Sequence, residues 1–118
     1  MINNDALADA GLDPATFTTS DWDQLSAATT KLTSTSGGKL QRIGFDPKIP
    51  EFLPMWARAN GAALVSDDGR TARLNDPKVI QAVEYTVGLI DAQGGWAKFK
   101  SFRDSFDFFG AKNQFATD

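Results

Sequence analysis

Residues 76–95, DPKVIQAVEYTVGLIDAQGG, contain the local signals expected of an α-helix from its first residue to its last. Asp76 belongs to a residue type favoured at the N-cap, and Pro77 suits the first helical position. The glycine pair at 94–95 can take the left-handed conformation that ends a helix. Apolar residues recur between these ends at helical spacing, namely Val79, Ile80, Val83, Val87 and Ile90. The stretch therefore predicts a helix that buries this apolar face.

Three helices are expected upstream. Residues 4–10 form a short one, closed by Gly11. Ser20 and Asp23 resemble a capping box, and the helix behind them should end within TSTSGG, residues 33–38. Pro50 can occupy a first helical position, and the helix that follows should place one apolar side on the core and end near Asn60. That side consists of Phe52, Met55, Trp56 and Ala59.

Two segments indicate β-structure, and the last part of the chain is rich in phenylalanine. LQRIGF (40–45) is predicted as a short strand, and ALVSDDGRTARL (63–74) as a small hairpin whose Asp67-Asp68-Gly69 is turn chemistry. Phe99, Phe102, Phe106 and Phe109 have helical spacing. The fold class predicted for residues 1–118 is α+β, predominantly α-helical, with a few short strands.

Composition excludes several functions. The chain has no histidine and no cysteine, so a zinc site of the usual ligand types, a cysteine nucleophile and a Ser-His-Asp triad are excluded. Twelve basic residues against fifteen acidic ones give a net charge of -3, without the basic stripe that nucleic acids require. No apolar run approaches the roughly 20 residues that span a membrane, and MINNDALADAG lacks the features of a signal peptide. We expect no enzyme activity, no metal and no cofactor.

The order of these segments resembles the extracellular solute-binding proteins of bacterial ABC importers, in the sugar-binding family that includes maltose-binding protein. NNDALADAGLDP followed by TSDWDQLSAATTKL is similar to a segment of that family that contains a tryptophan, and Trp22 stands in its place. The stretch MWARANGAALVSDDGRTARLNDPKVIQAVEYTVGLIDAQGG resembles its helix, glycine turn, hairpin and following helix. FGAKNQFATD is similar to the approach to a later motif. NGAA departs from the family's usual NGG, and Asp118 stands near the glycine of the later motif.

The resemblance implies the fold, function and setting of the protein. It implies a partial lobe, mostly C-terminal, of a two-lobed type II binding-protein fold. The parent protein would capture a sugar or similar polar solute without covalent chemistry and deliver it to a membrane permease. It would work outside the cytoplasm, in the periplasm or as a cell-surface lipoprotein. The phenylalanine row is then expected to pack on chain encoded further along or on another copy.

Sugar sites combine an aromatic ring with polar groups that fix hydroxyls, which makes the tryptophans the first candidates. Trp56 is the leading one, because the family often has a stacking aromatic on this helix; the alternative is a core residue. Trp96 follows a glycine turn and can be exposed. Glu51 and Asn60 border the helix of Trp56 and can bind hydroxyls, although a solvated charge and a helix cap are the alternatives. Trp22 is expected to pack at the start of its helix.

Two other hypotheses remain. The chain can be a self-contained interaction domain that uses its phenylalanine face to bind a partner helix or to form a homo-oligomer. Asp104 and Asp107 have an i, i+3 spacing that suggests paired carboxylates, but two acids on one side of a short helix are more typical of a solvated face than of a glycosidase.

Overall fold

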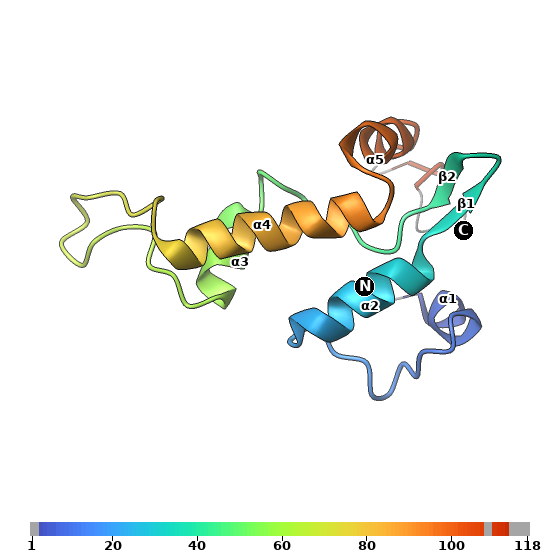
Figure 1. The fold of residues 1–118 in the computed structure, drawn as a ribbon, viewed down its shortest axis with the longest axis horizontal. Coiled ribbons are helices and arrows are strands. Elements are labelled where there is room, and N and C mark those ends of the chain that lie inside the picture. The colour runs from blue at the N-terminus through green and yellow to red at the C-terminus, as the bar shows by residue number, and fades with distance from the viewer. Residues whose placement is uncertain (1–2, 108–109, 114–118) are drawn as a thin grey trace. The chain divides into compact units, whose positions relative to one another are not determined.

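The computed structural model describes residues 3–107 and 110–113 and is mostly helical (Figure 1). Within these residues there are five helices and one two-stranded antiparallel hairpin, an α+β-like arrangement. The chain divides into two compact units, one of residues 1–45 and 90–118 and the other of residues 46–89. The elements are α1 (Asn4–Asp9), α2 (Trp22–Leu32), β1 (Ser34–Ser36), β2 (Lys39–Arg42), α3 (Leu53–Ala59), α4 (Pro77–Ala92) and α5 (Trp96–Arg103).

Glycine ends three of these helices, as their sequences predict. After α1, Gly11 has φ 68°, the N–H of Gly11 donates to the carbonyl of Ala8, and the N–H of Leu12 donates to that of Leu7. This pair of bonds defines the Schellman motif, which satisfies carbonyls that the helix leaves open. The same pair of bonds recurs after α3 with Gly61 and after α4 with Gly94.

The N-cap of α2 differs from the prediction by one residue. Asp21, not Ser20, caps the helix, and its carboxylate accepts from the backbone N–H groups of Asp23 and Gln24 at 2.9 and 3.1 Å. The side chain of Gln24 returns a bond to Asp21 at 3.3 Å. Both pairs have the spacing of three residues, but Gln24 is of the residue type usual at the third position of this pattern, whereas Asp23 behind Ser20 is not.

The hairpin of the first unit consists of β1 and β2. The prediction of a strand over 40–45 is confirmed in part, because β2 covers Lys39–Arg42. Its partner β1 was not predicted; it lies in the stretch expected to end the preceding helix. Gly37 and Gly38 form the two-residue turn with φ 57° and 75°, the conformation that tight hairpins favour and that glycine permits. Helix α5 packs against β2.

In the second unit, α3 begins later than predicted. It starts at Leu53, and Pro50 lies in the preceding turn rather than at the first helical position. Pro54 explains the difference. A helix beginning at Pro50 would need a backbone N–H at its fifth residue, which proline lacks, whereas a start at Leu53 keeps Pro54 in the first turn.

Helix α4 has the predicted bounds, and Asp76 caps it by accepting from the N–H of Lys78 at 2.8 Å. Its buried face is only partly the predicted one: Ile80, Val83 and Val87 are exposed by 47%, 36% and 41%. The buried residues are spaced by three and four, namely Val79, Ala82, Thr86, Leu89 and Gln93, together with Ile90. Ala82 and Thr86 have small side chains and are fully buried, so a neighbouring segment can approach this face closely. The more apolar face, with Ile80, Val83 and Val87, is the one left exposed.

The side of α3 that was predicted to face the core is mostly exposed. Trp56 is buried, but Phe52 and Met55 are about half exposed, and Ala59 is exposed. The second buried residue of α3 is Ala57. In Figure 1 the helix lies along the first part of α4, and the amide of Asn60 contacts α4 there.

The hairpin predicted over 63–74 is reduced to a single antiparallel bridge between Val65 and Ala72. Its turn is as expected, with Gly69 at φ 72°. The carboxylate of Asp68 accepts from the hydroxyl of Ser66 and from the N–H of Arg70. Because this segment is exposed almost throughout, no core face holds two long strands in register.

The phenylalanine row does not remain helical to its end. Helix α5 stops at Arg103, so Phe106 lies beyond it, and Phe109 is outside the described residues. Phe99 is fully buried by the chain itself, so the expectation that it needs cover from elsewhere is wrong. Phe102 and Phe106 are half-buried and pack with ring centroids 4.8 Å apart. No helix in the described part of the chain is long and apolar enough to cross a membrane.

Candidate functional site

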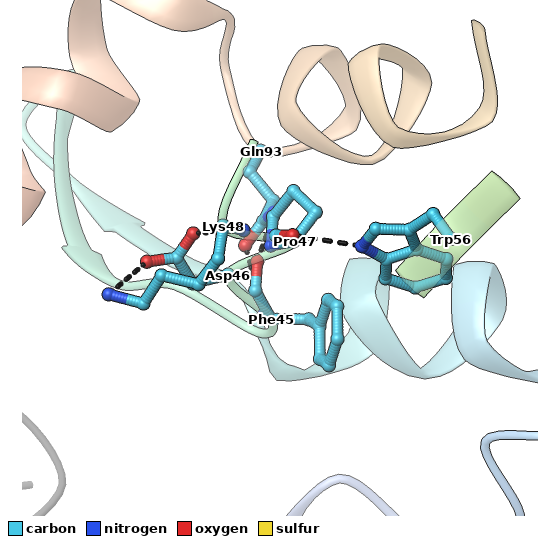
Figure 2. A network of polar contacts seen from close by, with 6 residues as sticks. All are labelled: Phe45, Asp46, Pro47, Lys48, Trp56 and Gln93. Carbon is cyan, nitrogen blue, oxygen red and sulfur yellow. Dashed lines mark hydrogen bonds and ion pairs between the residues drawn. The ribbon is translucent and has the colours of Figure 1, made fainter. Parts of the chain in front are cut away.

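Trp56 lies inside the second unit. Only 6% of the residue is exposed, and its indole nitrogen donates to the carbonyl oxygen of Pro47 at 2.9 Å, as Figure 2 shows. Its ring is tilted by 52° against that of Tyr85, with centroids 5.8 Å apart. A buried indole with a satisfied N–H is the usual arrangement for a core tryptophan. Stacking of a sugar on Trp56 stays a prediction, and it requires the ring to become accessible.

Asn60 and Glu51 flank α3 as predicted. Asn60 is the C-cap of the helix, and its amide nitrogen donates to the carbonyl of Lys78 at 2.9 Å and to the side chain of Gln81 at 3.2 Å. These bonds link α3 to the first turns of α4. Glu51 is exposed in the turn before α3. Asn60 thus has a structural task, and Glu51 presents its carboxylate to solvent.

Trp96 is the first residue of α5, and 48% of it is exposed. The guanidinium of Arg103 lies over its ring, 5.8 Å from the centroid, within the range of a cation–π interaction. Lys100, one helical turn further on, forms an ion pair with Asp104. The indole is therefore half exposed, with the Arg103 guanidinium over its ring and the Lys100–Asp104 ion pair on the same helix.

The four predicted residues are divided between the two units. Glu51, Trp56 and Asn60 belong to residues 46–89, and Trp96 belongs to the unit that includes residues 90–118. Each group is therefore a separate candidate. Of the four, Trp96 has the more accessible aromatic ring.

The two carboxylates considered as an acid/base pair are both exposed. Asp104 pairs with Lys100, and Asp107 lies three residues later, beyond the end of α5. Exposure and ion pairing are the features of a solvated face, as expected. Among the residues that the structure describes, no group of three or more acidic side chains could hold a metal ion.

Sequence reasoning missed Gln93, which organises the first unit. Its side-chain oxygen accepts from the N–H of Gly44 at 2.8 Å and of Phe45 at 3.2 Å, and its amide nitrogen donates to the carbonyl of Phe45 at 2.8 Å. The residue is 1% exposed. Gln93 follows Leu89 by four residues, so the three-and-four spacing of the buried α4 face could have identified it.

Gly44 is part of the same arrangement. A Cβ atom placed on it would lie 2.2 Å from the backbone oxygen of Thr29 in α2. Only glycine allows the backbone to approach another segment so closely. Residues 44–45, at the end of the predicted strand 40–45, therefore contact α2 closely at Gly44 and are hydrogen-bonded to the amide of Gln93.

The pKa of the Asp68 carboxyl is lowered, and the cause is the turn in which it lies. Its hydrogen bond from the hydroxyl of Ser66, followed by that from the N–H of Arg70, lowers the pKa of the Asp68 carboxyl from its ordinary 3.8. Both donors stabilise the ionised form. The shift reflects local turn geometry, as the sequence suggests for this Asp-Asp-Gly stretch.

Comparison of the chain with models of protein families, with curated proteins and with solved structures found no match.

Proposed function

We propose that the chain is part of a protein that captures a sugar or a similar polar solute without covalent chemistry and delivers it to the permease of an ABC importer. The proposal rests on the collinear sequence resemblance and on the half-exposed indole of Trp96. It includes a partial lobe of a two-lobed type II binding-protein fold as the setting. The parent protein would then work outside the cytoplasm.

Trp96 is the observation that carries the proposal. A pyranose presents a face of C–H groups that stacks on an aromatic ring, while its hydroxyls need hydrogen-bonding partners at the ring's edge. The indole of Trp96 is open to solvent, and Arg103 lies against its ring at 5.8 Å. Lys100 stands one turn away on the same side of α5. This combination supplies both parts of a stacking site.

Trp96 takes precedence over Trp56 in the proposal for a physical reason. A ligand that stacked on Trp56 would have to displace the chain that buries its ring and break the bond from its indole nitrogen to Pro47. Breaking such a buried bond costs about 1–3 kcal/mol before any sugar contact forms. Trp96 is already half exposed, and a sugar would only have to share its ring with the guanidinium of Arg103. Glu51, exposed beside α3, is the second polar candidate in the other unit.

The test is a proton–nitrogen correlation NMR spectrum of the whole chain during titration with maltotriose, cellotriose and xylotriose. We expect one of these sugars to move the indole signal of Trp96 and to leave that of Trp56 in place. The variant Trp96→Ala should lose the response, whereas Trp96→Phe should keep part of it. If none of the sugars moves the Trp96 signal, or if Trp56 responds instead, the assignment to Trp96 is wrong.

The alternative, an interaction domain with a phenylalanine face, has less support. Phe99 is fully buried, and Phe102 packs on Phe106, so these rings do not form an open docking surface. Apart from Trp96, the large apolar side chains that are exposed in the described residues lie at the start of α3, on α4 and in the connection between these helices.

A further inference from the structure

The uncovered apolar side chains of α4 form a narrow stripe, which we define as Ile80, Val83 and Val87. Residues three, four and seven apart lie on one side of a helix, so these three side chains are neighbours. They are 47%, 36% and 41% exposed. From Ile80 to Val87 the stripe extends about 10 Å along the helix. Single exposed apolar residues are ordinary, whereas three neighbours on one side of a helix form a small continuous apolar surface that a partner can cover.

The stripe adjoins the buried face of α4 on one side. Val79 and Ala82 are buried within one residue of the stripe. The contacts of α3 lie elsewhere on the helix, at Lys78, Gln81 and Tyr85. The apolar surface of α4 is thus wider than the part that α3 and the rest of its unit cover.

Acidic residues border the stripe. Asp76 and Glu84 stand four residues before and four residues after Ile80, so all three lie in one row along the helix. Glu84 is exposed, and Asp76 caps the helix. The basic residue of α4, Lys78, is directed to the other side, where its ammonium donates to the carbonyl of Gly61 at 3.4 Å. The charge beside the stripe is therefore negative.

This charge selects the class of partner. A second copy laid along the stripe would bring the acidic rows of two α4 helices together, which like-charge repulsion disfavours. A partner with basic residues beside an apolar row would match both features. The partner is also expected to be helical, because the backbone groups of α4 bond within the helix and offer no edge to which a strand could pair. Side-chain packing is the contact that remains.

We propose that the stripe Ile80, Val83 and Val87, with Asp76 and Glu84 at its border, docks a basic amphipathic helix of another protein segment. Apolar side chains of the partner would cover the stripe, and lysine or arginine side chains would lie against the two carboxylates. The proposal does not rest on the sugar site at Trp96, which belongs to the other unit.

The test uses the whole chain and a fluorescein-labelled synthetic peptide of roughly 15 residues or more, with leucines in an i, i+3, i+4, i+7 row and lysines beside them. Its matched peptide has glutamate in place of each lysine. Fluorescence anisotropy should show saturable binding of the lysine peptide, at least roughly tenfold tighter than that of the glutamate peptide, with an affinity that falls as sodium chloride is added.

Matched variants locate the contact. We expect Val83→Ser to weaken binding of the lysine peptide roughly fivefold to tenfold, and Met55→Ser, at a more exposed apolar residue of α3, to change it less than about twofold. Glu84→Gln should weaken it roughly twofold to fivefold and reduce its salt dependence. Asp67→Asn, which removes the same charge from the exposed turn, should have no effect.

Three outcomes would overturn the proposal. One is that the two peptides bind equally well or that the lysine peptide does not bind. Another is that Met55→Ser or Asp67→Asn has the same effect as the stripe variants, which would mean non-specific attraction to an acidic protein. The third is that sedimentation shows a concentration-dependent dimer that Val83→Ser abolishes, because then a second copy covers the stripe.

Discussion

Buried polar residues show how single side chains position segments of this chain. Of the residues described, Thr29, Thr86 and Gln93 are buried and polar. The hydroxyls of Thr29 and Thr86 donate to carbonyls one turn earlier in their own helices, at 2.7 and 2.8 Å. The amide of Gln93 instead bonds to Gly44 and Phe45, more than forty residues away in sequence. A threonine hydroxyl in a helix finds its hydrogen-bond acceptor within the same helix, whereas the amide of Gln93 determines which distant segment packs beside it.

The carboxyl of Asp68 gives a pH-dependent prediction. Its pKa lies below 3.8 in the folded chain, chiefly because the hydroxyl of Ser66 donates to it. A carboxyl with a lowered folded pKa stabilises the fold fully above its unfolded pKa and loses that contribution as the pH falls through its folded pKa. We expect the turn 66–71 to keep its geometry at neutral pH and to loosen below pH 3.8.

The measurement is an NMR titration of the Asp68 carboxyl carbon in the wild-type chain and in Ser66→Ala. The pKa should rise toward 3.8 in this variant, since the largest cause of the shift is removed. Ser101→Ala, at an exposed serine of α5, is the control and should leave the Asp68 titration where it was. An unchanged Asp68 pKa in Ser66→Ala would show that this hydrogen bond is not the cause.

At the scale of helices and strands, the sequence predicted where helices end more accurately than which of their faces is buried. The glycines at 11, 61 and 94 end α1, α3 and α4 as expected, because a positive φ is a local property that glycine satisfies at any position. The buried face of α4 was predicted only in part. Which of two adjacent apolar sides is covered depends on the neighbour that packs there, and that neighbour is not encoded in the helix itself.

The strands show the same limit. The paired hairpin lies over 34–42, where a Gly-Gly turn fits the tight-turn geometry, and not over 63–74. Among the candidate site residues, exposure of Trp96 after a glycine turn was anticipated. The bond from Trp56 to Pro47 and the hydrogen bonds of Gln93 could not be predicted, since both are contacts between segments distant in sequence.

Gly88 within α4 and Gly94 just after it should respond oppositely to substitution by alanine. Gly88 lies inside the helix with no atom within 4 Å of the position where a Cβ would stand, so Gly88→Ala should raise the free energy of unfolding by about 0.5–1 kcal/mol. Gly94, at φ 103°, ends the helix, and Gly94→Ala should lower it by about 1 kcal/mol or more. Urea unfolding followed by circular dichroism measures both. Destabilisation by Gly88→Ala would mean that the outer side of α4 is covered in solution.

At the scale of the whole molecule, each compact unit has its own polar contact at the connection between Phe45 and Asp46. In the first unit Gln93 holds Gly44 and Phe45 by three hydrogen bonds. In the second unit Trp56 holds Pro47 through its indole nitrogen, and Lys48 pairs with Asp46 at 3.1 Å. Figure 2 shows Gln93 and Phe45 of the first contact and Trp56, Pro47, Asp46 and Lys48 of the second. Each unit therefore fixes its own end of this connection by contacts within itself.

If the two units are also units of stability, variants in each should act separately. Trp56→Phe removes the bond to Pro47 and should cost about 1–3 kcal/mol in the second unit. Gln93→Leu removes three part-buried bonds to Gly44 and Phe45 in the first unit, of which the Gly44 N–H keeps a second acceptor in the Thr33 hydroxyl, and should cost about 2 kcal/mol or more. Native-state hydrogen exchange measured by NMR reports the opening of each region. Trp56→Phe should speed exchange in α3 and the first turns of α4, and Gln93→Leu should speed it in α2 and β2. Equal acceleration of the same amides by both variants would show that the chain opens as one cooperative unit, in spite of its division into two compact parts.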